Sequence, residues 1–143
     1  MKKYDAVIIG FGKGGKTLAG TLAANGKNVA LIEKDADMYG GTCINVGCIP
    51  SKSFVTSAAF SAKLDSSFEE KAKLYRKAVE KKTRLTAALR DKNYHKVADL
   101  ENADVYNGTA SFLDSRHVAV ALQGETLELE ADQIFINTGA RPF

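Results

Sequence analysis

Two cysteines are the residues of this chain best suited to chemistry. Cys43 and Cys48 lie in the stretch GGTCINVGCIPSK, which runs from residue 40 to residue 52. Two thiols at this spacing could pack in a core, bind a metal ion or exchange electrons. A zinc site needs about four ligands, and beyond the two thiols the chain offers only His95 and His117, both far along the sequence. The pattern therefore predicts no metal site and favours redox chemistry, with two merely packed thiols as the remaining alternative.

The surroundings of the second cysteine favour a reactive thiol. Proline is well tolerated at a helix start, so Pro50 predicts that Cys48 lies in the first turn of a helix that continues through residues 51–62. The N–H groups at a helix start stabilise a thiolate, and Lys52 adds positive charge nearby. Gly41 and the glycine before it keep the backbone slim where a flat cofactor would approach. We therefore expect a redox-active pair, although the spacing alone does not name its substrate.

A dinucleotide-binding pattern opens the chain. The apolar run DAVIIG is typical of a strand buried in a parallel sheet. The pattern G-x-G-x-x-G follows at Gly10, Gly12 and Gly15, before a helix expected over residues 16–26. A second apolar strand, NVALIEK, carries Glu33 at its tip, where a carboxylate can accept hydrogen bonds from ribose hydroxyls. Since the glycines also let a pyrophosphate approach the helix start, the unit predicts FAD or NAD binding. A glycine turn without a ligand is the alternative.

The sequence pattern around these residues predicts helices and strands that together form an α/β fold. Phe68, Ala72, Tyr75 and Val79 recur at helical spacing and indicate a long charged helix over residues 68–92. A further short helix is expected over 93–100, and strands over 103–113, 117–122 and 126–140, with a turn at 123–124. We therefore expect a Rossmann-like parallel sheet with a small antiparallel β layer and a long helix pair.

Composition narrows the function classes. The chain has 143 residues, which fits one domain. The net charge of +3 is too mild to require a nucleic-acid partner, and the basic face of the long helix is typical of a solvated surface. No apolar run is long enough to span a membrane or to make the start a signal peptide. We therefore expect a cytoplasmic protein with neither nucleic-acid nor membrane partners. Because the chain stops directly after an apolar strand, we also expect it to be part of a longer protein.

Several stretches together resemble a known family. GGTCINVGCIPSK, GFGKGG, LIEK and the late INTGARP are similar to the FAD domain of the class I pyridine nucleotide-disulfide oxidoreductases, over essentially the whole chain. GFGKGGKTLA, YGGTCIN, RDKNYHKVADL and IFINTGA look most like the RclA-type reductases, a branch linked to bacterial resistance to reactive chlorine species. The resemblance implies that residues 1–143 are the N-terminal part of an FAD-binding domain. It also implies that electrons pass from NAD(P)H through FAD and a Cys43–Cys48 disulfide to an oxidised substrate.

The resemblance assigns a role to each matching residue. Cys43 matches the interchange thiol that meets the substrate, Cys48 the thiol beside the flavin, and Lys52 a lysine near the flavin ring. Thr42 matches a hydroxyl near the phosphates, Ala110 a backbone contact with adenine, and Thr138 and Gly139 an element that closes over FAD. The cofactor-binding residues implied are Gly10, Gly12, Gly15, Glu33, Lys34, Gly41, Thr42, Cys48, Lys52, Ala110, Thr138 and Gly139.

The chain also departs from the family pattern. Lys13 stands where many relatives carry proline, and Asn137 where many carry alanine. The NAD(P)H domain, a return segment of the FAD domain and the dimerisation domain are absent. The resemblance implies that the full-length protein is a homodimer acting on a small molecule or oxidant, and that this part alone is inactive and binds FAD weakly. An FAD-dependent oxidase or monooxygenase and a non-enzymatic redox sensor are the alternatives, and the terminal acceptor stays open.

Overall fold

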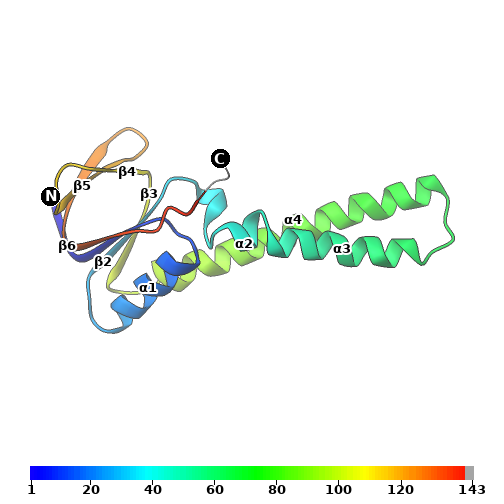
Figure 1. Ribbon diagram of the computed structural model, residues 1–143, viewed down its shortest axis with the longest axis horizontal. Helices are drawn as coiled ribbons and strands as arrows, with labels where there is room; N and C mark the ends of the chain where they lie inside the picture. Colours follow the sequence, from blue (N-terminus) through cyan, green and yellow to red (C-terminus); the bar gives the residue numbers. More distant parts are fainter. Residues whose placement is uncertain (141–143) are drawn as a thin grey trace.

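The computed structural model describes residues 1–140 and shows a sheet-and-helix body from which a pair of long helices projects (Figure 1). The body begins with the predicted βαβ unit: β1 (Lys2–Ile9), α1 (Lys13–Ala24) and β2 (Val29–Glu33). β1 and β2 pair in parallel, with Val7 opposite Ala30. α1 begins three residues earlier than expected. The helix therefore starts inside the glycine pattern, directly after Gly12, and provides the helix start that a phosphate needs.

One six-stranded sheet carries both the parallel and the antiparallel strands. The later strands are β3 (Ala103–Asn107), β4 (Thr109–Phe112), β5 (His117–Ala121) and β6 (Thr126–Ile136), and the order across the sheet is β3-β2-β1-β6-β5-β4. The pairs β3–β2, β2–β1 and β1–β6 are parallel, whereas the pairs β6–β5 and β5–β4 are antiparallel. β6 therefore links the two parts, since it pairs with β1 along one edge and with β5 along the other.

The single strand expected over residues 103–113 is wrong, because the chain forms two strands there. Gly108 separates β3, which extends the parallel sheet beside β2, from β4, which pairs with β5. A β-carbon on Gly108 would lie 2.5 Å from the carbonyl oxygen of Ala121, so the chain can turn this closely only with glycine. The backbone N–H of Gly108 donates to the carbonyl oxygen of Glu33 at 2.9 Å. This bond ties the turn to the tip of β2.

Two hydrophobic cores lie on opposite faces of the parallel strands. On one face, Val118 and Val120 of β5 share a core with Val7 and Ile32, so the antiparallel strands fold over the sheet as a layer. The other face packs against α1 and α4 (Phe68–Ala98) through a core made of Ile8, Phe11, Ala19, Ala23, Val29, Leu31 and Val97. The expected α/β fold, with a parallel sheet and a small antiparallel layer, is confirmed.

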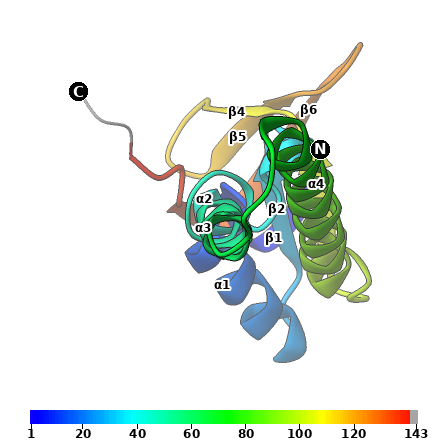
Figure 2. The same cartoon turned by 90° about the vertical axis from the view of Figure 1, so that its right-hand side faces the viewer.

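The expected helix pair is present, but its second member is longer than predicted. α3 (Cys48–Ala62) and α4 pack side by side and extend away from the sheet, as the end-on view confirms (Figure 2). The expected break near residue 92 is wrong: α4 runs unbroken for 31 residues. No glycine or proline interrupts it, and burial of Val97 against the sheet stabilises its last turn. Ser67 and Glu70 form a capping box at its start.

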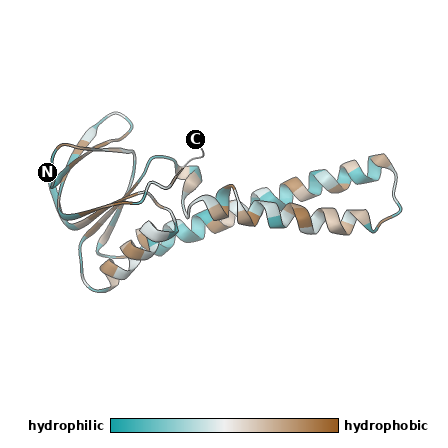
Figure 3. Ribbon diagram, in the orientation of Figure 1, coloured by the Kyte–Doolittle hydropathy of each residue, from teal (hydrophilic) through white to brown (hydrophobic). Residues whose placement is uncertain are grey.

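Apolar residues recur along the outer half of the helix pair (Figure 3). Val55, Phe60, Phe68 and Tyr75 are each more than half exposed. None of the helices within residues 1–140 has the length and apolar character needed to cross a membrane.

Candidate functional site

The glycine loop between β1 and α1 leaves a helix start open to an anion. Gly12 is the N-cap of α1, no side chain caps the helix, and its first turn holds no acidic residue. The N–H groups of that turn therefore lack the side-chain oxygen that usually satisfies them. An anionic pyrophosphate fits such a start, because it accepts these hydrogen bonds and its charge is favoured by the helix dipole.

Glu33 is held beside this loop. Its Oε2 accepts a hydrogen bond from the backbone N–H of Phe11 at 2.8 Å, and its Oε1 accepts one from Asp35 at 3.2 Å. These bonds fix the carboxylate at the tip of β2, next to the start of α1. The placement is that expected for a carboxylate that binds ribose hydroxyls. Lys34 follows directly and is exposed.

The turn between β3 and β4 reaches the same carboxylate-bearing residue. Asn107 donates from Nδ2 to the carbonyl oxygen of Glu33 at 2.8 Å, alongside the bond from Gly108. Ala110 lies two residues further on, in β4, opposite Val120 of β5. Since β4 is the last strand of the sheet, some of its backbone groups have no strand partner and are free for another ligand. The bonds from Asn107 and Gly108 to Glu33 bring Ala110 near the tip of β2.

The segment after β6 lies on the glycine loop. Asn137 donates its backbone N–H to the carbonyl oxygen of Ile9 at 2.8 Å, and its Nδ2 donates to that of Gly10 at 3.2 Å. A β-carbon on Gly10 would lie 3.3 Å from the backbone nitrogen of Thr138. Thr138 and Gly139 are exposed beside the loop. The residues that complete the late motif, Arg141 and Pro142, lie outside the described part of the chain.

The thiol-bearing segment is anchored to the same loop. The backbone N–H of Gly40 donates to the carbonyl oxygen of Phe11 at 3.0 Å. Gly41 adopts φ +88°, and a β-carbon on it would lie 2.9 Å from Cα of Gly12. A short helix that the sequence did not predict, α2 (Thr42–Asn45), follows at once and carries Thr42 and Cys43. Only a backbone without side chains can bring the two segments this close.

Cys48 begins α3, as predicted, and its N-cap residue provides no side-chain bond. Both thiols are free and exposed. The pKa of Cys43 is raised, mainly because its thiol hydrogen-bonds to the Cys48 sulfur and to a lesser degree by burial, while the positive charge of Lys52 opposes this shift. The thiol of Cys43 therefore lies within hydrogen-bonding reach of the Cys48 sulfur. The structure brings Cys43, Cys48 and Lys52 together.

Two residues that the sequence did not single out support this segment from the helix layer. Lys16 of α1 donates from Nζ to Oδ1 of Asn93 on α4, and Asn93 packs against Gly40. Their only sequence signal is a lysine directly after the last glycine of the pattern. Tertiary packing brings them to Gly40, three residues before Cys43.

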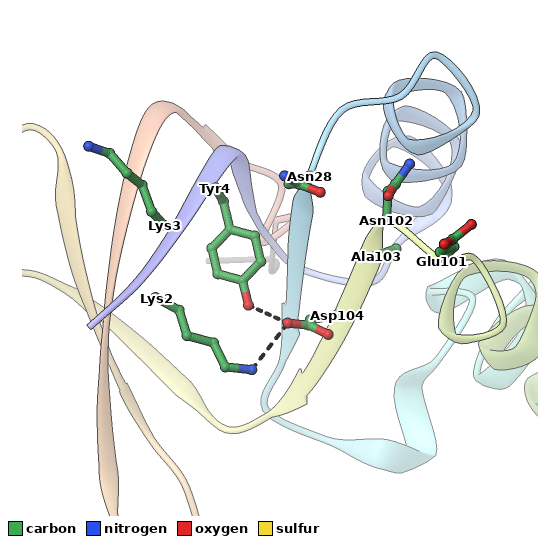
Figure 4. A pocket seen from close by; sticks show the side chains of 8 residues that line it. All are labelled: Lys2, Lys3, Tyr4, Asn28, Glu101, Asn102, Ala103 and Asp104. Carbon is green, nitrogen blue, oxygen red and sulfur yellow. Dashed lines mark hydrogen bonds and ion pairs between the residues drawn. The ribbon is translucent and has the colours of Figure 1, made fainter.

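A separate polar cluster lies at the opposite end of β1 (Figure 4). Tyr4 donates to Asp104, its hydroxyl lies 2.5 Å from that of Tyr106, and Lys2 pairs with Asp104 at 3.3 Å. The pKa of Tyr4 is raised, first by burial and then by these hydrogen bonds. The hydroxyl of Tyr4 likewise holds the pKa of Asp104 below its usual value. The cluster ties β1 to β3 and contains none of the predicted site residues. Across residues 1–140, no group of three His, Cys, Asp or Glu side chains is arranged to hold a metal ion.

Comparison with known proteins matches this site to one family. A family model described as pyridine nucleotide-disulphide oxidoreductase matches residues 4–143. The chain is 46% identical over 141 residues to the probable pyridine nucleotide-disulfide oxidoreductase RclA of Escherichia coli strain K12, covering 99% of this chain and 30% of that protein. It is 34% identical over 147 residues to the mercuric reductase of Streptomyces lividans, covering 97% of this chain and 31% of that protein.

A solved structure agrees with the sequence matches. The Cu(II) complex of the HOCl-induced flavoprotein disulfide reductase RclA from Escherichia coli superposes with a TM-score of 0.87 at 46% identity, covering all of this chain and 30% of that one. The chain thus spans about 30% of the length of the relatives it matches. The glycine loop, the carboxylate at the tip of β2 and the paired thiols coincide with matches over nearly the whole chain, so this chain belongs to the pyridine nucleotide-disulphide oxidoreductase family.

Proposed function

We propose that this chain is the N-terminal FAD-binding part of a flavin- and dithiol-dependent oxidoreductase. In the whole protein, electrons pass from NAD(P)H through FAD and the Cys43–Cys48 disulfide to an oxidised substrate. The observation that carries the proposal is the contact between Gly41 and Gly12, because it places the thiol segment directly against the loop suited to a pyrophosphate. A dithiol beside a dinucleotide site is an arrangement for electron transfer.

The residues of this chain fit FAD along its length. Gly10, Gly12 and Gly15 admit the pyrophosphate to the start of α1, and Glu33 accepts hydrogen bonds from the adenosine ribose. Ala110 provides a backbone contact for adenine near the tip of β2. The remaining proposed contacts are Lys34, Gly41, Thr42, Thr138 and Gly139. Bound FAD would supply the hydride chemistry that no amino-acid side chain offers.

The two thiols have different roles in the proposed electron transfer. Cys48 faces the flavin and Cys43 faces the substrate, while Lys52 provides positive charge beside the pair. When an acceptor takes two electrons, the sulfur–sulfur bond forms and the pair gives up its protons. Reduction through Cys48 restores the two thiols.

The whole protein supplies what this chain does not carry. We propose that further domains bind NAD(P)H and join two subunits into a homodimer, and that this chain alone does not turn over. A cytoplasmic location belongs to the same proposal, because a reducing compartment keeps an exposed dithiol cycling. An isolated chain of these 143 residues that oxidised NADPH would contradict it.

A thiophilic metal ion is one candidate acceptor. One relative is named a mercuric reductase, and the superposed RclA structure is a Cu(II) complex. The two exposed sulfurs of this chain are soft ligands suited to such ions. Two Cu(II) ions would take one electron each as the dithiol becomes a disulfide. Anaerobic mixing of the reduced full-length protein with two equivalents of Cu(II) should therefore produce Cu(I) and leave no free thiol at Cys43 or Cys48.

The central test uses the full-length protein with FAD bound. Anaerobic reduction by NAD(P)H should produce a long-wavelength absorbance band from the Cys48 thiolate to the flavin. Cys48→Ser should abolish that band, whereas Cys43→Ser should keep it, because the flavin-side sulfur remains. Each variant removes one thiol, but only Cys48→Ser removes the sulfur proposed to lie beside the flavin. A band lost in Cys48→Ser and kept in Cys43→Ser therefore identifies Cys48 as the donor.

The same variants separate the alternatives. Unchanged NAD(P)H-driven reduction of disulfide substrates by Cys48→Ser would exclude the dithiol route and favour an oxidase or monooxygenase that uses flavin alone. A full-length protein that oxidises its thiols reversibly but consumes no NAD(P)H would indicate a redox sensor.

A further inference from the structure

A groove of about 490 Å³ lies between α1 and the last turn of α4. Its wall on α1 is one helical face, whose residues recur every three or four positions from Lys13 to the C-cap of the helix. Lys96 lines the groove from α4. Since the 12 residues of α1 extend about 18 Å, the groove continues well beyond the helix start proposed for FAD. Its volume falls in the range of small-molecule sites, about 300–1,000 Å³.

Three ammonium groups line this groove without a carboxylate to balance them. Lys13 and Lys16 come from α1 and Lys96 from α4, and no Asp or Glu of the described chain lines the groove. α1 itself contains no acidic residue. Asp99, the C-cap of α4, pairs with His95 at 2.9 Å instead. The salt bridges within residues 1–140 include none of the three lysines, so their charge is free to meet an anion.

Lys16 is held in the groove by a neutral partner. Its ammonium group has three hydrogens to donate, and in the described part of the chain the only acceptor that it reaches is Oδ1 of Asn93. The pKa of Lys16 is lowered, first by burial and then by the positive charges of Lys13 and Lys96. A half-buried ammonium group with one neutral acceptor is costly. An anion in the groove would offset this cost, because opposite charge favours the charged form.

A glycine in the middle of α1 keeps the groove open. Gly20 lines the groove, and a β-carbon on it would meet nothing within 4 Å. Packing therefore does not require glycine here, although glycine inside a helix costs about 1 kcal/mol relative to alanine. Thr21 follows in the same wall and offers a hydroxyl that can donate to an anion. The missing side chain at Gly20 leaves room for a ligand between the lysines.

We propose that the groove between α1 and α4 binds a phosphate chain, the di- or triphosphate group of a free polyphosphate or of a nucleotide, through Lys13, Lys16 and Lys96. Adjacent phosphates carry several negative charges in a row, which suits ammonium groups spread over a turn of α1 and the facing turn of α4. Lysine binds phosphate as a point charge, so it tolerates such a chain in more than one register. The site uses neither thiol, so it is independent of the proposed dithiol function.

The test uses the full-length protein with FAD bound, so that the FAD site is already filled. Isothermal titration with inorganic triphosphate at about 0.05 M salt should show saturable binding, and raising salt to about 0.5 M should weaken it, because ions screen exposed charges. We expect Lys96→Gln to weaken binding about three- to tenfold, the effect of losing one partly exposed charge contact. Lys81→Gln, at an exposed site on α4, removes the same charge and should bind as the parent does.

Gly20→Leu tests the shape of the groove without changing its charge. The leucine side chain would fill the space between the lysines, so we expect triphosphate affinity to fall by about tenfold or more. Thermal stability should stay at or above that of the parent, because leucine is a better helix former than glycine. Since Lys96 is exposed, Lys96→Gln still tests the proposal if Gly20→Leu fails to fold.

ATP identifies the source of the phosphate chain. Equal affinities for ATP and inorganic triphosphate would assign the groove to the phosphates alone, whereas tighter ATP binding that Gly20→Leu abolishes would assign it to a nucleotide.

Three outcomes would overturn the inference. One is a parent protein that does not bind triphosphate at low salt, and another is binding that neither Lys96→Gln nor Gly20→Leu alters. The third is release of FAD during the titration, seen as a rise in flavin fluorescence, which would place the triphosphate at the glycine loop. Failure of the proposed function would appear elsewhere, as the absence of the thiolate–flavin band in the protein that retains Cys48.

Discussion

The backbone of Gly41 lies directly against that of Gly12. A β-carbon on Gly41 would stand 2.9 Å from Cα of Gly12 and 3.3 Å from the backbone nitrogen of Lys13. The contact joins the segment that carries the thiols to the loop that begins α1. A cofactor whose phosphates lie at that loop is therefore brought next to Cys43 and Cys48.

Gly41→Ala should destabilise the full-length protein and release FAD. The new methyl group meets Gly12 at a positive φ, so we expect a loss of about 2–4 kcal/mol in the free energy of unfolding. Gly124→Ala is the matched control: Gly124 has φ +90° but nothing within 4 Å of its β-carbon position, so it should cost only about 1 kcal/mol. Thermal unfolding and FAD fluorescence measure both effects. Equal losses in the two variants would show that the close contact is unimportant.

Asn137→Ala should weaken the glycine loop. It removes the Nδ2 bond to the carbonyl oxygen of Gly10 and the amide group that lies beside Gly12, Gly14 and Gly15. We expect a loss of about 1 kcal/mol in stability and weaker FAD binding. Asn25→Ala removes a similar bond, from Nδ2 to the Thr21 carbonyl at 2.8 Å, at the far end of α1. FAD titration should separate the variants, and similar FAD affinities would contradict a role for Asn137 in the loop.

Glu33→Gln should reduce FAD affinity while leaving the fold intact. Glutamine keeps the size of the side chain but is a weaker acceptor for Phe11 N–H and for ribose hydroxyls than a carboxylate. We expect affinity to fall by about ten- to a hundredfold, since hydrogen bonds to a charged group contribute about 1.5–3 kcal/mol. Glu128→Gln, exposed on β6, should bind FAD as the parent does. Isothermal titration of the apoprotein measures the affinities, and an unaltered affinity in Glu33→Gln would remove this residue from the site.

Asp104 should make stability depend on pH at the acid end. Its pKa is lowered in the folded protein, first by the Tyr4 hydrogen bond, with Lys2 adding to the effect. The stability that it contributes is therefore fully present above the unfolded carboxyl pKa of about 3.9 and is lost as pH falls through the lower folded value.

Asp104→Asn tests this dependence. The carboxylate is about half exposed, at 49%, so the variant should lose no more than about 1 kcal/mol at pH 6. The gap between variant and parent should close as pH falls below about 4. Asp65→Asn, in the turn between α3 and α4, is the control. Thermal unfolding from pH 2.5 to 6 measures the difference, and a gap that widened toward acid pH would contradict the sign.

The βαβ unit and the helix start at Cys48 could be predicted because their signals are local. Glycine spacing, an apolar strand on each side and Glu33 at a strand tip all lie within about thirty residues. Pro50 likewise marks the helix start at Cys48 without help from the rest of the chain. The strand break at Gly108 could not be predicted, because it depends on which strands pair on either side. The length of α4 was also missed, since burial of Val97 in the sheet core stabilises its last turn.

The sequence by itself determined the family, the fold class and which two residues carry thiols. The fold class follows from residue type, spacing and periodicity, which act over short stretches of chain, and the family follows from the resemblance of several motifs to those of known relatives. Only the tertiary structure decided what lies around the thiols. Lys16, Asn93 and Gly40 are separated by many residues, and they meet because α1 and α4 cover the same face of the sheet. Contacts of this kind depend on how helices pack, a long-range property that no short pattern encodes.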